Sequence, residues 1–221
     1  NNPQDFGWLQ TTVSNPQGRR VSRYDIFTLQ HSEGGSLLAQ VDQSETVDIP
    51  TLGPGPRLQQ TRLEVADGPH RLTLRPKGDG EVRIFGVSAE REGSGVIVDT
   101  IGIRGREARS WLQWDPAIAI EGMAALDSDL VVLAYGTNEA NDPTYEMGRY
   151  ASDLRKVLAL MRQGLPEAAC VLVGPTDRAK KLGEDTFAIW DRTALVAQVQ
   201  QQVAPEFGCV SWDWQTVTGG P

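Results

Sequence analysis

The hydrophobic pattern changes its period part-way along the chain. Between residues 21 and 91, short segments alternate apolar and polar side chains, and turn signals such as Gly34-Gly35 and Gly53-Pro54-Gly55-Pro56 separate them. Alternation with a period of two is typical of strands that bury one face. The pattern predicts an all-β jelly-roll or sandwich domain over residues 1–95.

Beyond residue 95 the pattern predicts strands that alternate with helices. Runs rich in apolar residues, typical of buried strands, cover residues 96–103, 130–134, 170–173 and 209–214, and the run at residues 130–134 is unbroken. Apolar side chains recur at helical spacing over residues 145–162 and 187–203, with helix starts expected at residues 141–143 and 184–186. This order predicts an α/β domain over residues 96–221 with a flavodoxin-like, doubly wound parallel sheet.

Polar residues follow the apolar run at residues 130–134. The tetrapeptide Gly136-Thr137-Asn138-Glu139 places an amide and a carboxylate just after this strand. In open α/β sheets, ligands bind at the carboxyl ends of the strands. Taken alone, the tetrapeptide is explained equally well as a turn, because glycine and asparagine are ordinary turn residues.

The order of the motifs resembles the SGNH (GDSL-type) ester hydrolases. Gly136-Thr137-Asn138-Glu139 resembles the family's third block, and the turn at Gly105 resembles its second block; Gly102 is the alternative for that glycine. The resemblance implies that the Asn138 amide and the Gly105 N–H donate to the oxyanion of a tetrahedral intermediate. Thr137 and Glu139 are expected to contact substrate. One such donor lowers the barrier by about 3 kcal/mol.

One branch of that family fits most of the chain. It comprises the peptidoglycan O-acetylesterases, in which a carbohydrate-binding-like sandwich is inserted between the first and second blocks. The supporting segments include Gly34-Gly35-Ser36, Gly174-Pro175-Thr176-Asp177 and residues 68–72, 85–90 and 208–214. The resemblance implies an O-acetylated glycan substrate and a periplasmic, cell-envelope or secreted location. The sequence has neither the spacing of metal ligands nor a phosphate-binding glycine loop, so no cofactor or metal is expected.

The residues that would perform the chemistry are missing from the sequence. It has no Gly-Asp-Ser triplet for a nucleophile, and its two histidines are His31 and His70. Asp67-Gly68-Pro69-His70 has the spacing of the family's Asp-x-x-His, but it precedes the second block and is expected to be a turn and a strand edge. His31 is expected to be a solvated turn residue. We therefore expect this chain to be cut within the catalytic domain and inactive alone.

Two further readings stay open. A non-catalytic glycan-binding protein would use the sandwich, with the α/β part as a scaffold. A structural subunit would gain its missing elements from a partner chain. If the chain hydrolysed esters after all, Ser88 and Ser110 would be the first serines to mutate.

Composition narrows the function classes. The net charge of −8 argues against binding to nucleic-acid phosphates, and no apolar run approaches the roughly 20 residues of a membrane span. Cys170 and Cys209 each precede a predicted strand, and neighbouring parallel strands would bring their α-carbons within disulfide range. We favour two reduced core cysteines over the disulfide, because buried cysteine is common in strands.

Overall fold

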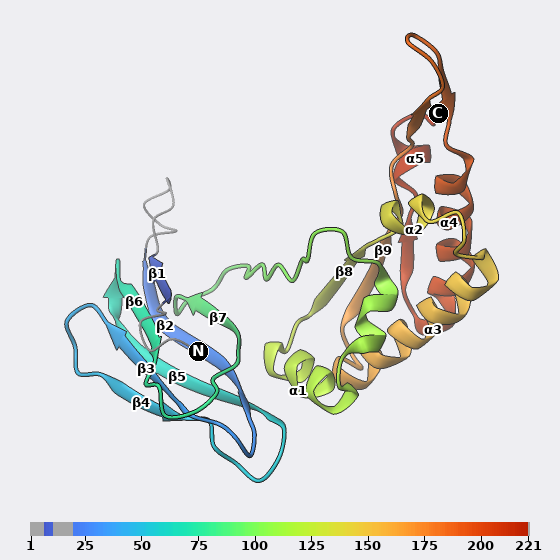
Figure 1. Ribbon diagram of the computed structural model, residues 1–221. Coiled ribbons are helices and arrows are strands. Elements are labelled where there is room, and N and C mark those ends of the chain that lie inside the picture. The colour runs from blue at the N-terminus through green and yellow to red at the C-terminus, as the bar shows by residue number, and fades with distance from the viewer. Residues whose placement is uncertain (1–6, 11–19, 221) are drawn as a thin grey trace. The chain divides into compact units, whose positions relative to one another are not determined.

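The computed structural model describes residues 7–10 and 20–220. Contacts between α-carbons divide the chain into two compact units, Asn1–Ile101 and Gly102–Pro221 (Figure 1). Each unit has its own apolar core. The units therefore separate after Ile101, whereas the sequence pattern alone places the boundary after residue 95.

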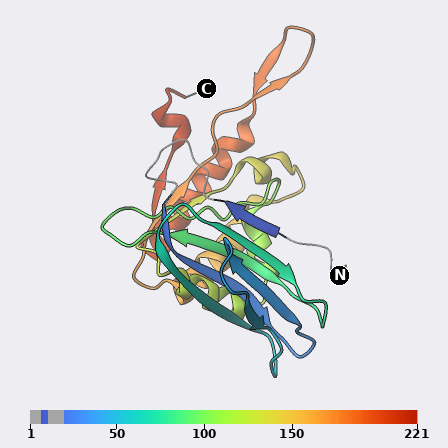
Figure 2. The ribbon, with the colours of Figure 1, turned by 90° about the vertical axis from the view of Figure 1, so that its left-hand side faces the viewer.

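The first unit consists of antiparallel strands in two sheets (Figure 2). Its strands are β1 Gly7–Gln10, β2 Val21–Gln30, β3 Ser36–Val41, β4 Val47–Pro50, β5 Arg57–Gly68, β6 Arg71–Pro76 and β7 Ile84–Glu90. One sheet has the order β1-β6-β3-β4 and the other has the order β5-β2-β7. The predicted antiparallel strands are therefore present, while the jelly-roll connectivity stays a prediction.

Both sheets contribute side chains to one apolar core. Tyr24 and Ile26 from β2 are fully buried in it, as are Leu37 from β3 and Leu72 from β6. Alternate residues of these strands point into the core, as the period-two pattern requires. The central strand β2 also buries Asp25, which is only 3% exposed.

The second unit combines a parallel sheet with helices. Its elements are η2 Ala108–Gln113, α1 Pro116–Leu126, β8 Leu130–Ala134, α2 Thr137–Asn141, α3 Met147–Gly164, β9 Ala169–Val173, β10 Ala179–Lys181, β11 Phe187–Ile189, α4 Asp191–Val203, η3 Ala204–Phe207, β12 Val210–Trp212 and α5 Trp214–Val217. The parallel strands have the order β12-β9-β8, and β10 and β11 form a separate antiparallel hairpin.

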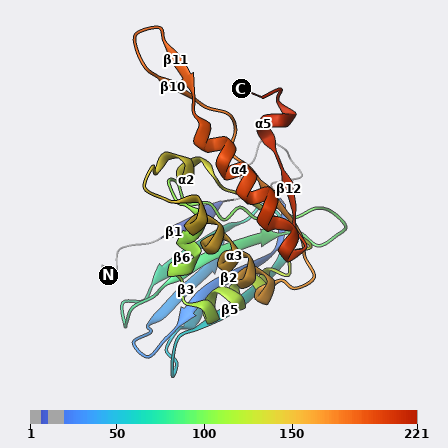
Figure 3. The same ribbon diagram turned by 90° about the vertical axis from the view of Figure 1, so that its right-hand side faces the viewer.

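Helices α3 and α4, which are labelled in Figure 3, pack against one face of the parallel sheet. Leu133 and Leu172 from the strands pack in one buried cluster with Leu158 from α3 and Val196 from α4. On the opposite face Val132 is 54% exposed. Among the described residues, helices therefore do not cover both faces, which corrects the expectation of a doubly wound sheet.

The predicted strand at residues 96–103 is absent. This segment has no regular secondary structure, and Val96 and Val98 are 90% and 80% exposed. A strand needs a neighbour that pairs with its backbone N–H and C=O groups. No described strand pairs with this segment, so its apolar composition alone does not make it a strand.

Both predicted helices begin later than expected. Phe187–Ile189 pairs with Ala179–Lys181 as the hairpin, and α4 starts only at Asp191. Likewise α3 starts at Met147, because Thr137–Asn141 already forms the short helix α2. Apolar side chains at helical spacing thus identified each helix correctly but not its first residue.

A disulfide joins Cys170 and Cys209, with α-carbons 4.6 Å apart. Val171 of β9 and Val210 of β12 are register partners, so the bond links adjacent parallel strands where both begin. The predicted proximity is correct. The preference for reduced cysteines is wrong, because strand pairing brings the two side chains together as well as their α-carbons.

Candidate active site

The turn after β8 is built around a glycine that no other residue can replace without strain. Gly136 has a φ of 131°, a region that L side chains rarely adopt. A Cβ atom there would lie 2.6 Å from Cδ of Pro175 and 2.9 Å from Cγ1 of Val196. Glycine therefore lets the chain turn closely against its neighbours and begin α2 at Thr137, at the carboxyl end of the strand.

A second glycine turn lies in the loop that precedes η2. The Arg106 N–H donates to the Ile103 carbonyl across 3.2 Å, and Gly105 within this turn has a φ of 76°. Gly105 is exposed, and a Cβ there would meet no atom within 4 Å. The backbone conformation, and not crowding, therefore favours glycine. Gly102 is not among the residues with positive φ.

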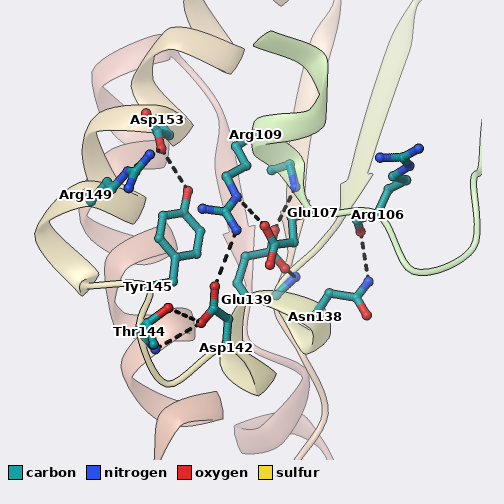
Figure 4. Close-up of polar contacts among 12 residues, drawn as sticks. Arg106, Glu107, Arg109, Asn138, Glu139, Asp142, Thr144, Tyr145, Arg149 and Asp153 are labelled. Atoms are coloured by element: carbon teal, nitrogen blue, oxygen red, sulfur yellow. Dashed lines mark hydrogen bonds and ion pairs between the residues drawn. The ribbon is translucent and has the colours of Figure 1, made fainter. Parts of the chain in front are cut away.

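Asn138 connects these two turns. Its side-chain Nδ2 donates to the Arg106 carbonyl across 2.8 Å, which places the amide beside the residue that follows Gly105 (Figure 4). The asparagine amide carries two hydrogens, and this bond uses one of them. The second hydrogen can donate to another acceptor. The structure thus places the Asn138 amide beside the turn that contains Gly105, and the oxyanion hole itself stays a prediction.

Glu139 does not lie where a substrate could reach it. Its exposure is 0%, and its Oε1 accepts from the Ala108 N–H at 2.7 Å while its Oε2 accepts from the Gly136 N–H at 2.9 Å (Figure 4). The expected contact with substrate is therefore corrected to an internal tie. The spacing of Glu139 three residues after the helix N-cap is a known capping signal, which could have indicated this role.

Thr137 remains accessible at the start of α2.

A second polar connection, which the sequence did not indicate, lies nearby. The Arg109 guanidinium pairs with Glu107, reaches Asp142 across 3.4 Å and lies 4.1 Å from the centre of the Tyr145 ring. Arg109 thus links η2 to the residue after α2.

Neither histidine is available as a general base. His70 has Asp42 Oδ2 2.7 Å from Nδ1 and the Ala66 carbonyl 2.6 Å from Nε2, so both ring nitrogens are engaged. Burial alone would lower the pKa of His70, but Asp42 and the Ala66 carbonyl outweigh it and raise the pKa. His31 is half-buried rather than solvated, and its Nε2 is shielded from solvent without a hydrogen-bond partner.

The two serines singled out from the sequence lie in different settings. The Ser88 hydroxyl donates to Glu90 across 2.6 Å on β7. Ser110 lies within η2, where its backbone N–H donates to the Glu107 carbonyl. No contact of either serine identifies it as an activated nucleophile in the described part of the chain.

Residues 7–10 and 20–220 contain neither a metal-binding cluster nor a membrane-spanning helix. No group of three or more His, Cys, Asp or Glu side chains is placed to hold a metal ion. None of the helices in these ranges is both long and apolar enough to span a membrane.

The family follows from a sequence comparison. A profile of the GDSL-like Lipase/Acylhydrolase family matches residues 77–221, and the chain belongs to this family. The match covers the whole second unit, including Gly105 and Asn138. No curated protein matches the chain.

Several solved structures match most of the chain, with very different TM-scores. A structure described as a peptidoglycan O-acetylesterase in action matches with a TM-score of 0.75 and 24% identity, over 97% of this chain and 57% of that one. Family two carbohydrate esterases from Cellvibrio japonicus and Clostridium thermocellum match with TM-scores of 0.35 and 0.34 and identities of 12% and 13%. These two cover 94% and 98% of this chain, and 88% and 91% of theirs.

The first of these comparisons shows that the chain has the SGNH hydrolase fold, with its parallel sheet and helices. The chain spans little more than half the length of that peptidoglycan O-acetylesterase structure.

Proposed function

We propose that this chain carries the oxyanion-binding part of a carbohydrate O-acetylesterase. The observation that carries the proposal is the hydrogen bond from Asn138 to the Arg106 carbonyl, which brings the asparagine amide beside the Gly105 turn. Acyl transfer places a negative charge on the former carbonyl oxygen of the ester. Preorganised donors stabilise that charge more than the neutral ester, so they accelerate the chemical step.

In the proposed reaction, Gly105 and Asn138 hold the oxygen while a serine attacks the acetyl carbon. The backbone N–H of Gly105 and the second hydrogen of the Asn138 amide are the donors. Thr137, exposed beside Asn138, is the proposed contact for the rest of the substrate. The sequence has no Gly-Asp-Ser triplet that could supply this serine, and it has no usable Asp-x-x-His that could supply the histidine.

The proposed substrate is an O-acetylated cell-wall glycan such as peptidoglycan. The named activity of the matched structure supports this substrate class. The disulfide supports an oxidising location, which is the periplasm, the cell envelope or the extracellular space. The first unit is proposed to be a carbohydrate-binding-like domain that accompanies the esterase.

A groove in the first unit favours a second candidate function. It has a volume of about 590 Å³ and lies between the end of β3 and strand β5, where Asp42, Arg62, Glu64 and His70 line it. A non-catalytic glycan-binding protein would use such a groove and would need neither serine nor histidine. Titrating the chain with acetylated and deacetylated peptidoglycan fragments, with NMR shifts as the readout, distinguishes a site at this groove from one at Asn138.

The proposed function is tested by binding of a tetrahedral anion. Methylphosphonate resembles the intermediate of acetyl transfer, and its oxygens should accept from both donors. We expect saturable shifts of the Gly105 amide and the Asn138 side-chain amide, which Asn138→Ala abolishes. Asn141→Ala is the matched control, because Asn141 lies on the same helix and its side chain contacts Arg178 instead. Shifts at other sites alone would refute the oxyanion role.

The isolated chain should not hydrolyse p-nitrophenyl acetate faster than buffer does. No serine and histidine in the described ranges form the nucleophile and base that acyl transfer needs. Saturable turnover that a serine-directed inhibitor abolishes would show that a nucleophile exists elsewhere in the chain.

A further inference from the structure

Glu139 is a buried carboxylate with an unusual set of partners. It is completely buried, and both of its oxygens accept from backbone N–H groups, those of Ala108 and Gly136. No lysine or arginine in the described ranges forms an ion pair with it. A buried charge costs free energy unless it is paired or fully hydrogen-bonded. For Glu139 the two backbone N–H groups take the place of a cation.

The two partners belong to the two loops of the candidate site. Gly136 lies two residues before Asn138, and Ala108 lies three residues after Gly105. Figure 4 shows Glu139 between these segments, with Asn138 on one side and the start of η2 on the other. One side chain therefore fixes the separation of the two loops that carry the proposed donors.

The ionised form of Glu139 makes the stronger pair of bonds in this geometry. Each oxygen faces a backbone N–H donor, and both oxygens of a carboxylate accept strongly. In a protonated carboxyl group the hydroxyl oxygen accepts more weakly, so one of the two bonds would weaken. The tie between the loops therefore depends on the charge of Glu139.

The surroundings of Glu139 act on that charge in opposite directions. Burial raises its pKa, the backbone N–H bonds lower it, and the nearby Glu107 carboxylate raises it again, with a net rise. From α3, the Tyr150 hydroxyl also faces Glu139, and burial together with the Glu139 charge keeps it protonated. The Arg109 guanidinium pairs with Glu107 and Asp142 rather than with Glu139.

We propose that Glu139 is a positioning residue that holds the Gly105 and Asn138 loops together while it is ionised and releases them when it is protonated. The site is then assembled at neutral pH and loosens in mildly acidic solution. The significance of this switch for catalysis rests on the proposed function, whereas the tie itself does not. A test without substrate therefore separates the two.

The test is an NMR pH titration of the intact chain from pH 8 to pH 4, which follows backbone and side-chain amides. We expect the amides of Ala108 and Gly136 and the Asn138 side-chain amide to shift together, with one midpoint above the usual glutamate range. In Glu139→Gln this common titration should vanish. Glu206→Gln is the matched control, because Glu206 pairs with Arg155 on the surface of the same unit and its loss should leave the titration unchanged.

Two results would overturn the proposal. Asn138 could stay unchanged while Ala108 and Gly136 titrate, which would make Glu139 a local cap only. The common titration could also persist in Glu139→Gln, which would assign it to another group. If the variant fails to fold, the wild-type titration still decides whether Asn138 follows the two backbone amides. Failure of methylphosphonate to bind would leave this result untouched and would count against the oxyanion role alone.

Discussion

The two units solve the same problem, a buried carboxylate, in different ways. In the first unit, Asp25 accepts from Arg62 and Gln60 at 2.9 Å and 3.0 Å and pairs with Arg23 at 3.0 Å. In the second unit, Glu139 relies on backbone N–H groups.

Their pKa values differ accordingly. Burial would raise the pKa of Asp25, but hydrogen bonds from Arg62 and Gln60 and the charges of two arginines lower it overall. Burial dominates for Glu139 and raises its pKa. Asp25 thus stabilises the fold in its charged form, whereas the charge on Glu139 opposes folding. This contrast is consistent with a structural role for Asp25 and with the positioning role that we propose for Glu139.

The largest expected effect is a loss of stability that is confined to the second unit. Replacing both cysteines by serine removes a bond that spans 39 residues. The chain-entropy model gives a loss of about 4 kcal/mol in the unfolding free energy of the second unit. The first unit should keep its own transition, which urea unfolding followed by NMR signals of each unit would show. An equal loss in both units would mean that they do not unfold independently.

A smaller loss is expected from Gly136→Ala. Its positive φ and the contacts of a Cβ with Pro175 and Val196 should together cost about 3 kcal/mol. Gly148→Ala is the control, because Gly148 is an exposed position in the first turn of α3 with nothing within 4 Å of a Cβ, and it should stabilise by about 0.5 kcal/mol. Chemical denaturation of both variants measures the difference. Equal stability of the two variants would exclude a strained turn at Gly136.

Asp25→Asn should destabilise the first unit by about 2 kcal/mol, the value of hydrogen bonds to a charged group. Because the pKa of Asp25 is lowered in the folded state, its contribution is present above the unfolded pKa near 4 and is lost as the pH falls through the folded value. The free energy of unfolding should therefore fall less in acid for the variant than for the wild-type chain. Asp48→Asn, at a solvent-exposed pair with Lys77, should leave the profile unchanged. If the stability of Asp25→Asn fell in acid as much as that of the wild-type chain, another group would be responsible for the acid sensitivity.

For the second unit we expect the free energy of unfolding to change with pH in the opposite direction, because of Glu139. Because its pKa is raised in the folded state, the unfolded chain ionises first as the pH rises, and the second unit loses stability through that interval. Glu139→Gln should flatten this part of the profile by less than the Asp25 effect, since the two N–H bonds offset much of the cost. Denaturation at several pH values between 4 and 7 measures it. A gain in wild-type stability over that interval would contradict the account.

Much of the fold was predictable because it follows from local pattern. The alternation in β2 and β3 and the helical spacing in α3 arise from side chains that face a core. The strand predicted at residues 96–103 was wrong, because a strand also requires a partner, which no local pattern reveals. The proximity of Cys170 and Cys209 was predicted correctly, but the predicted redox state was wrong.

The candidate site was predictable in part for a related reason. Asn138 and Gly105 were selected from motif order, and the structure brings Asn138 to the residue after Gly105. The sequence predicts a substrate contact for Glu139 because it follows Asn138 at the carboxyl end of a strand, where ligands bind in open α/β sheets. Its burial depends on the Ala108 N–H, which lies 31 residues away in the sequence. The Arg109 contacts with Asp142 and Tyr145 are equally non-local.

The central claim is that Gly105 and Asn138 present their donors to one point. The most direct measurement is the nuclear Overhauser effect between the Gly105 amide proton and the Asn138 side-chain amide protons in the intact chain at neutral pH. The account predicts an observable effect that weakens in Glu139→Gln and persists in Glu206→Gln. Absence of the effect in the wild-type chain, with both signals assigned and sharp, would contradict the account.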